Sequence, residues 1–328
     1  MRIKVQTVFL SFHHLLSFSS CASVVQTIST TFSLGGRIMK HMFGKFFTAT
    51  VLLVLALVFI PCVSHSQSIR MVVRGDDMGM TQGSLAAFEK AFNEGVLTSG
   101  AIQVPAPWFE GAAELCKKNP RWCTGVHLTL CGEWIGCRWR PVLPWDKVPT
   151  MVDSDGFLYT HPDSLFSRKP NIKEIEAEFR AQIELARRKG INVQYIDAHY
   201  FGYKQYPGLE DLVIKLAKEY KAPISGMMNE TRFGGVYMTP VPQKKETAMK
   251  QLEALKPGLW LWVCHIGIES PEQNALVHSA PKDRFPDPGV GAHRAGELAV
   301  LLDPDVKALI KKKGIVLISY TDLWKEKK

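Results

Sequence analysis

Short apolar runs alternate with segments of helical periodicity along most of the chain. The runs are rich in β-branched and other apolar residues and fall at residues 69–73, 101–104, 125–130, 193–196, 259–264 and 315–319. Such alternation is typical of βα units around a mostly parallel sheet. The pattern therefore predicts an α/β fold, and no internal repeat is evident.

Two of the intervening segments carry clear helix signals. Apolar residues recur at helical spacing between the first two runs, and Gly95 follows them. Residues 171–190 show a longer apolar stripe, with acidic residues early and basic residues late, which suits the helix dipole. Asn171 can cap the start of this helix and Gly190 its end.

Residues 141–170 lack such a pattern. They are rich in Pro, Asp and Gly, with little periodicity. We therefore expect a long excursion over one face of the domain, and loops of this length are often functional lids.

More than half of the net positive charge of the chain lies in residues 1–66. The formal charge is +9, from 40 Lys and Arg against 31 Asp and Glu. Five of the basic residues and none of the acidic ones lie in residues 1–66, so the remainder carries only +4. Its charges are interspersed, and no basic run is interleaved with aromatic residues as in a phosphate-binding stripe. We therefore expect no nucleic-acid partner.

Residues 39–66 have the features of a secretory signal peptide. Lys40 and Lys45 give a basic start, residues 50–60 an apolar centre, and residues 64–66 a cleavage site. The alternative is a permanent membrane anchor, but Pro61 follows too soon for a span of about 20 apolar residues. We expect an exported protein, periplasmic or secreted, without a permanent membrane span. Residues 1–38 are then an upstream extension, and residues 67–328 form a single catalytic domain.

Five of the seven cysteines lie beyond this signal: Cys116, Cys123, Cys131, Cys137 and Cys264. Export would permit disulfides. The first two and the next two are close enough in sequence to pair, although the sequence does not fix the connectivity. A structural zinc site is disfavoured because a second cluster of paired ligands is lacking.

Two adjacent carboxylates at the end of the first run are the first candidates for chemistry. Residues 71–79 lead from an apolar strand into Asp76, Asp77 and a glycine turn. Neighbours in an extended strand face opposite ways, but a turn at its carboxyl end can direct both into one cavity, where catalytic groups of βα barrels collect. An Asp that caps the next helix would explain only one of the two. The pair would also repel a pyrophosphate, which argues against a nucleotide-binding turn.

Two later strands also offer Asp or His near their ends. His127 alternates with apolar residues, whereas Asp197 and His199 lie two residues apart and share a face if extended. A lone His of this kind could be structural, and Asp197 could orient an imidazole. A catalytic metal, however, typically takes three protein ligands and leaves a position for water. The three strand ends together therefore indicate a metal site.

Five short elements resemble those of the YdjC-like carbohydrate deacetylases, which are related to the polysaccharide deacetylases. In order they are Asp76-Asp77-x-Gly79, Gly125-x-His127-Leu128, Asp197-x-His199, Cys264-His265-x-Gly267 and Arg294-x-x-Glu297-Leu298. Each is weak alone, but five in the right order are specific. The similarity covers nearly all of the chain beyond the signal.

The resemblance implies a distorted TIM-like (β/α) barrel with one divalent metal ion, magnesium or zinc. The implied ligands are Asp77, His127 and His199. Asp76 is then the base that takes a proton from the attacking water. His265 would protonate the departing amine or support the oxyanion, although it could be structural. The residues expected around the metal or the substrate are Asp197, Tyr200 and Arg294.

Two departures from the family pattern lie close to the implied ligands. Arg74-Gly75 stands where the family usually has Asn-Ala, and Tyr200-Phe201 stands where further His residues are usual. The three ligands themselves are kept. The departures therefore bear on how the substrate is positioned.

Our main hypothesis is hydrolysis of the N-acetyl group of an amino sugar, in a short oligosaccharide or a glycolipid. Four aromatic residues could hold this acetylated carbohydrate by stacking or could pack in the core: Trp134, Trp139, Trp145 and Tyr200. The alternatives are a metal-dependent amidase that acts on a non-sugar amide and a non-catalytic glycan-binding protein. The sequence leaves a homo-oligomer open.

Overall fold

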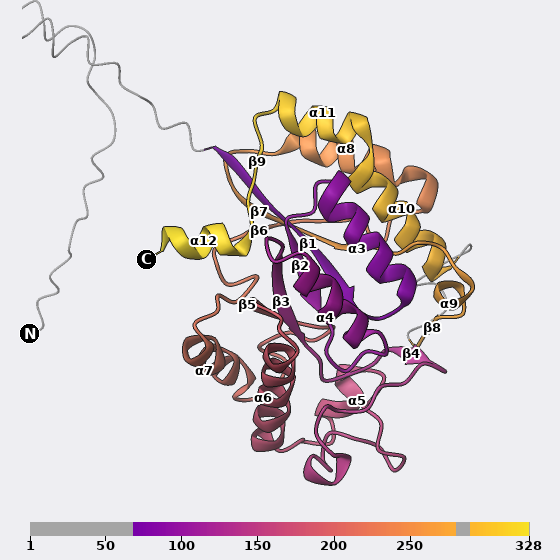
Figure 1. The fold of residues 1–328 in the computed structure, drawn as a ribbon, viewed down its shortest axis with the longest axis vertical. Helices are drawn as coiled ribbons and strands as arrows, with labels where there is room; N and C mark the ends of the chain where they lie inside the picture. The colour runs from indigo at the N-terminus through magenta and orange to yellow at the C-terminus, as the bar shows by residue number, and fades with distance from the viewer. Residues whose placement is uncertain (1–67, 280–288, 328) are drawn as a thin grey trace, which may run out of the picture. The chain divides into compact units, whose positions relative to one another are not determined.

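The computed structural model describes residues 68–279 and 289–327 (Figure 1). The expected extension and signal peptide, residues 1–66, lie outside these ranges and stay predictions. Within the ranges, no helix combines the length and the apolar character that a membrane span needs.

Seven parallel strands form the central sheet, in the order β5-β3-β2-β1-β7-β6, and β9 pairs with the start of β1. Their bounds are β1 Ile69–Met78, β2 Ser99–Ile102, β3 Cys123–Leu128, β5 Val193–Ala198, β6 Thr231–Phe233, β7 Gly258–His265 and β9 Val316–Leu317. In the described residues this ladder does not close between β5 and β6. The sheet is therefore a distorted, open (β/α) barrel in a single domain, and the predicted fold class is confirmed.

Helices pack around this sheet (Figure 1). The longer ones are α3 Gln82–Glu94, α4 Phe109–Lys118, α6 Ile172–Arg188, α7 Leu209–Tyr220, α8 Lys244–Ala254, α10 Val290–Leu302, α11 Pro304–Lys312 and α12 Tyr320–Glu326. The short ones are α5 Pro162–Phe166, α9 Pro271–Asn274 and the 3₁₀ turns η1 Trp145–Lys147 and η2 Val241–Gln243. Helices α8, α10 and α11 pack on one another, whereas α6 packs on β3 and β5. A small antiparallel sheet pairs β4 Trp134–Ile135 with β8 Val277–His278.

The six predicted strands are all present, Gly95 ends α3 as predicted, and α6 begins after Asn171 and ends before Gly190 as predicted. The Thr81 hydroxyl accepts a hydrogen bond from the N–H of Ser84 at the start of α3. At the start of α6 the side chain of Asn171 accepts from Lys173, and Gly190 follows the helix with a φ of 83°. Strands β4, β6 and β8 were not predicted because two or three residues carry no usable periodicity.

The irregular excursion of residues 141–170 is fixed to α6. The buried carboxylate of Glu178 accepts hydrogen bonds from the N–H groups of Val142 and Leu143, at 2.9 and 3.0 Å. Val148 and Met151 are also fully buried. The excursion is therefore packed against the domain as part of its core.

The five described cysteines are free thiols, so neither pair that the spacing allowed is formed. Four of them are buried, and burial raises the pKa of Cys264 well above its usual value. The Cys264 thiol donates instead to the backbone carbonyl of Arg74, at 3.3 Å.

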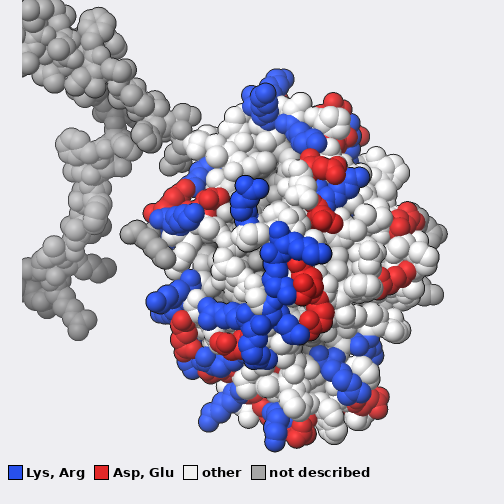
Figure 2. Space-filling view, viewed as in Figure 1, with Lys and Arg blue, Asp and Glu red and all other residues white. Residues whose placement is uncertain are grey.

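Charged side chains of both signs are mixed over the face shown in Figure 2. Lys189 pairs with Glu110 at 2.7 Å, and Lys245 bridges two carboxylates at the start of α11. The charges of these two lysines are thus locally neutralised.

One departure from the family pattern has a packing reason. A Cβ at Gly75 would lie 2.8 Å from Cε1 and 2.9 Å from Cζ of Phe88, so this buried ring fills the space that a methyl group would need. We predict that Gly75→Ala lowers the free energy of unfolding by about 1–3 kcal/mol through overpacking. Gly234→Ala is the control, since nothing lies within 4 Å of a Cβ there. Denaturant unfolding of the two variants checks this, and equal stabilities would contradict it.

Candidate metal centre

A break in strand pairing brings both adjacent carboxylates of β1 into one site. The register between β1 and β2 shifts between Gly75 and Met78, and Asp77 has a left-handed φ of 67°. Asp adopts this conformation more readily than most residues. His127 Nε2 consequently lies 3.9 Å from Asp76 Oδ2 and 3.5 Å from Asp77 Oδ1. The bulge thus overcomes the alternation that would otherwise point the two carboxylates apart.

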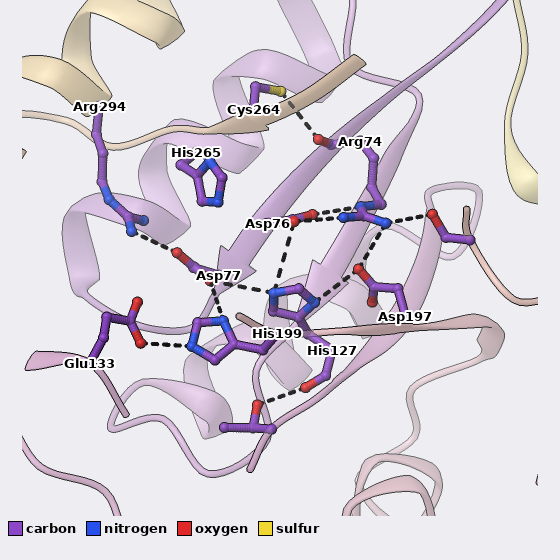
Figure 3. A network of polar contacts seen from close by, with 12 residues as sticks. Arg74, Asp76, Asp77, His127, Glu133, Asp197, His199, Cys264, His265 and Arg294 are labelled. Atoms are coloured by element: carbon purple, nitrogen blue, oxygen red, sulfur yellow. Dashed lines mark hydrogen bonds and ion pairs between the residues drawn. The ribbon is translucent and has the colours of Figure 1, made fainter. Parts of the chain in front are cut away.

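Three of the predicted residues converge from three strand ends (Figure 3). Asp77 lies on β1, His127 on β3 and His199 just beyond β5. Asp77 Oδ1 is 3.2 Å from His199 Nδ1, and one atom of each residue lies within 4.8 Å of the others. All three are buried, and Asp77 Oδ1 makes no hydrogen bond. A buried carboxylate oxygen that faces two imidazole nitrogens suits a divalent cation, so this cluster could hold a metal ion.

Each imidazole has a carboxylate on its other nitrogen. His127 Nδ1 lies 2.9 Å from Asp197 Oδ2, and His199 Nε2 lies 2.7 Å from Glu133 Oε2. Partners of this kind fix the orientation and tautomer of a metal-binding His. Asp197 was expected in such a role from its spacing. Glu133 was missed because it lies in a segment without periodicity and approaches His199 only through the fold.

The carboxylates strongly favour the protonated imidazoles. Burial lowers the pKa of His127, but Asp197, Asp76 and Asp77 together outweigh it and the pKa rises to about 10. Burial opposes the shift of His199 as well, yet Glu133 helps to raise its pKa to about 9. Without a metal the cluster therefore holds protons that a bound cation would displace.

A charge count leads to the same conclusion. Six buried charged side chains surround the two imidazoles: Asp76, Asp77, Glu133, Asp197, Arg74 and Arg294. With all six ionised, the two guanidiniums leave two negative charges uncompensated. Either two imidazolium protons or one divalent cation balances them.

Arg294 of α10 approaches the cluster from the side opposite Arg74 (Figure 3). Its Nη2 donates to Asp77 Oδ2 at 2.6 Å, and its guanidinium lies over the ring of Trp134. Burial would raise the pKa of Asp77, but Arg294, His127 and His199 together hold it well below its usual range. Asp77 is therefore ionised and ready to bind a cation.

His265 ends β7 and lies opposite Asp76 in the strand register. Its ring stacks on Tyr237 with centroids 4.1 Å apart, and its Nδ1 makes no hydrogen bond. The backbone N–H of His265 donates to Glu297 Oε2 at 2.6 Å, and Glu297 lies on α10 with Arg294. Burial lowers the pKa of His265 to about 4. The imidazole is therefore neutral near pH 7 and can offer a hydrogen bond without carrying a charge.

A small cavity of about 60 Å³ opens onto these groups. Asp76, His127, His199, His265 and Arg294 line it, together with the aromatic side chains Trp134, Tyr200, Tyr237 and His278. Residues 141–170 contribute nothing to its walls, so the excursion is not a lid of this cavity. Trp139 and Trp145, which were also considered for stacking, do not line it.

The match to a protein-family model decides the family. The model described as YdjC-like protein matches residues 70–312. The chain belongs to the YdjC-like family. The matched segment includes every candidate residue of the centre, from Asp76 to Arg294.

Curated relatives of this YdjC-like chain are named carbohydrate deacetylases. That of Enterococcus faecalis is 28% identical over 265 residues, which cover 77% of this chain and 98% of the relative. That of Brevibacillus brevis is 34% identical over 156 residues, or 47% of this chain, and the match spans only 58% of the relative. The structure of a proposed cellobiose-phosphate cleavage protein from Enterococcus faecalis has a TM-score of 0.65 at 23% identity, covering 78% of this chain and 99% of that one. This structural likeness shows the shared fold.

The contact between Glu133 and His199 generates a prediction for this YdjC-like centre. Glu133→Gln removes a charge but keeps the shape, so we expect Zn²⁺ to bind about tenfold more weakly. Titration calorimetry measures the affinity, and the thermal unfolding curve checks the fold. Glu110→Gln, on the surface beside Lys189, is the matched control and should bind Zn²⁺ as the wild type does. An unchanged affinity in Glu133→Gln would refute the orienting role.

Proposed function

We propose that this protein is a metal-dependent hydrolase that removes the N-acetyl group of an amino sugar, in a short oligosaccharide or a glycolipid. The observation that carries the proposal is the carboxylate of Asp76, which lines the same small cavity as His127 and His199 of the Asp77–His127–His199 cluster. Membership of the YdjC-like family and the names of the relatives support the substrate class.

The three-residue cluster would hold one divalent ion, magnesium or zinc. Bound there, the ion would polarise the acetyl carbonyl and make water a stronger nucleophile at neutral pH. Both metals remain candidates because two His and one Asp suit either of them.

In this proposal Asp76 accepts the proton of the attacking water. Both its oxygens are engaged by Arg74, and Oδ2 is the oxygen that lies 3.9 Å from His127 Nε2. A carboxylate held in one orientation would act as a general base on a water bound within hydrogen-bond reach of it. The accepted proton is then available for the departing amine.

His265 is suited to hydrogen bonding with the developing oxyanion. Its neutral imidazole carries no surplus proton near pH 7, so donation of an N–H hydrogen bond fits better than general acid catalysis. Among the aromatic side chains that line the cavity, the partly exposed Tyr200 could contact a sugar face, whereas Trp134 is fully buried. We also infer export, from the sequence features of residues 39–66 alone.

We predict that Asp76→Asn lowers kcat for acetate release at least about 100-fold, because the amide cannot accept the proton. Zn²⁺ affinity should fall far less, since Asp76 lies outside the ligand cluster. The assay measures acetate from N-acetylated chitooligosaccharides and from non-sugar acetamides, with and without a chelator. Asp146→Asn, an exposed Asp beside Lys147, is the control.

The same assay separates the alternatives. Full activity in Asp76→Asn would refute the assignment of the base, and release that survives the chelator would refute metal dependence. Turnover of non-sugar acetamides alone would identify a different amidase. Glycan binding without any turnover would identify a binding protein.

A further inference from the structure

Arg74 is a buried cation for which the predicted mechanism has no role. It lies two residues before Asp76 on β1, so both side chains leave the same face of the strand. Only 6% of its surface is exposed. Its Nε donates to Asp76 Oδ1 at 2.6 Å and its Nη2 to Asp76 Oδ2 at 2.7 Å. This two-pronged contact fixes the plane of the carboxylate as well as its position.

The same guanidinium also reaches the metal side of the site. Arg74 Nη1 lies 3.0 Å from Asp197 Oδ2, and that oxygen lies 2.9 Å from His127 Nδ1. One guanidinium therefore contacts both the candidate base and the carboxylate that orients a candidate ligand (Figure 3).

Arg74 fills the space of a second cation site. Asp76, His127 and Asp197 also place ligand atoms within 4.8 Å of one another. The guanidinium lies between the two carboxylates of this group and supplies its positive charge. The negative charge of Asp76 is thereby compensated without a second metal ion. Such an ion would occupy carboxylate lone pairs that a base needs.

The outer side of Arg74 is supported as well. Its Nη1 donates to the hydroxyl of Ser225, which contacts the hydroxyl of Tyr320. Tyr320 in turn donates to Glu230 at 2.9 Å. These neighbours hold the guanidinium from the side away from the cavity.

We propose that Arg74 is a positioning residue that couples the base to the metal site, by holding Asp76 and Asp197 in fixed geometry with one internal cation. The proposal rests on the proposed function, because it takes Asp76 as the base. It explains the departure of this chain from the Asn that its family usually carries. It predicts that Arg74 acts on turnover through Asp76 and on metal affinity through Asp197 and His127.

A double-mutant cycle tests the link to the base. We expect Arg74→Met to lower kcat about 100-fold with KM changed less than threefold, because misplacing a catalytic group by about 1 Å can cost that much. In an Asp76→Asn background, with Zn²⁺ saturating in every variant, the same change should have almost no further effect on kcat. Independent, multiplicative losses would overturn the proposal. Arg74→Lys keeps the charge without the planar fork and should retain an intermediate kcat.

Zn²⁺ titration of the metal-free protein tests the second link without any turnover. We expect Arg74→Met to bind Zn²⁺ at least about tenfold more weakly. Wild-type affinity in this variant would overturn the proposal. Arg180→Met is the matched control, since Arg180 also bridges two carboxylates, Glu176 and Glu219, but on the surface. The control should match the wild type in both measurements.

Two further variants keep the test decisive. Removing Arg74 leaves two buried carboxylates uncompensated, which can prevent folding. If Arg74→Met does not fold, Arg74→Lys and Ser225→Ala carry the test, and wild-type kcat and Zn²⁺ affinity in both would overturn the proposal. If the wild type binds Zn²⁺ but releases no acetate from any substrate, the proposed function fails, while the Zn²⁺ titration still tests Arg74.

Discussion

The charge balance of one buried cluster constrains the rest of this structure. Four carboxylates and two guanidiniums meet around His127 and His199, and two negative charges remain uncompensated. Isolated charges in such a place cost several kcal/mol each unless they are paired. The cluster therefore requires further positive charge, which either two imidazolium protons or one divalent cation would supply.

The parallel sheet gathers these charges because its strands all end at one edge. Strands β1, β3 and β5 deliver Asp77, His127 and His199 to that edge, and β7 adds His265. In a regular strand the two adjacent carboxylates of β1 would still point to opposite faces of the sheet. The break in pairing at Asp77 turns both towards His127 and so brings the two carboxylates into one site.

The sequence predicts what depends on local pattern. Alternating apolar runs predict the α/β class, and Asp and His at three strand ends predict the cluster, because parallel strands must bring such ends together. The sequence pattern does not predict contacts that tertiary packing sets. Glu133 carries no periodic signal, and the fork of Arg74 onto Asp76 depends on a side-chain conformation inside the barrel. Packing also determines that the described cysteines stay free thiols. It likewise determines that residues 141–170 pack on α6, away from the cavity.

The most direct test of the account is the position of a bound ion. Crystals grown with Zn²⁺ and measured at the zinc absorption edge would show it as an anomalous peak. The account predicts one peak, bound by Asp77 Oδ1, His127 Nε2 and His199 Nδ1, with Asp76 outside the ligand set and still held by Arg74. No peak at this cluster, or a peak between Asp76 and Asp197 with Arg74 displaced, would contradict it.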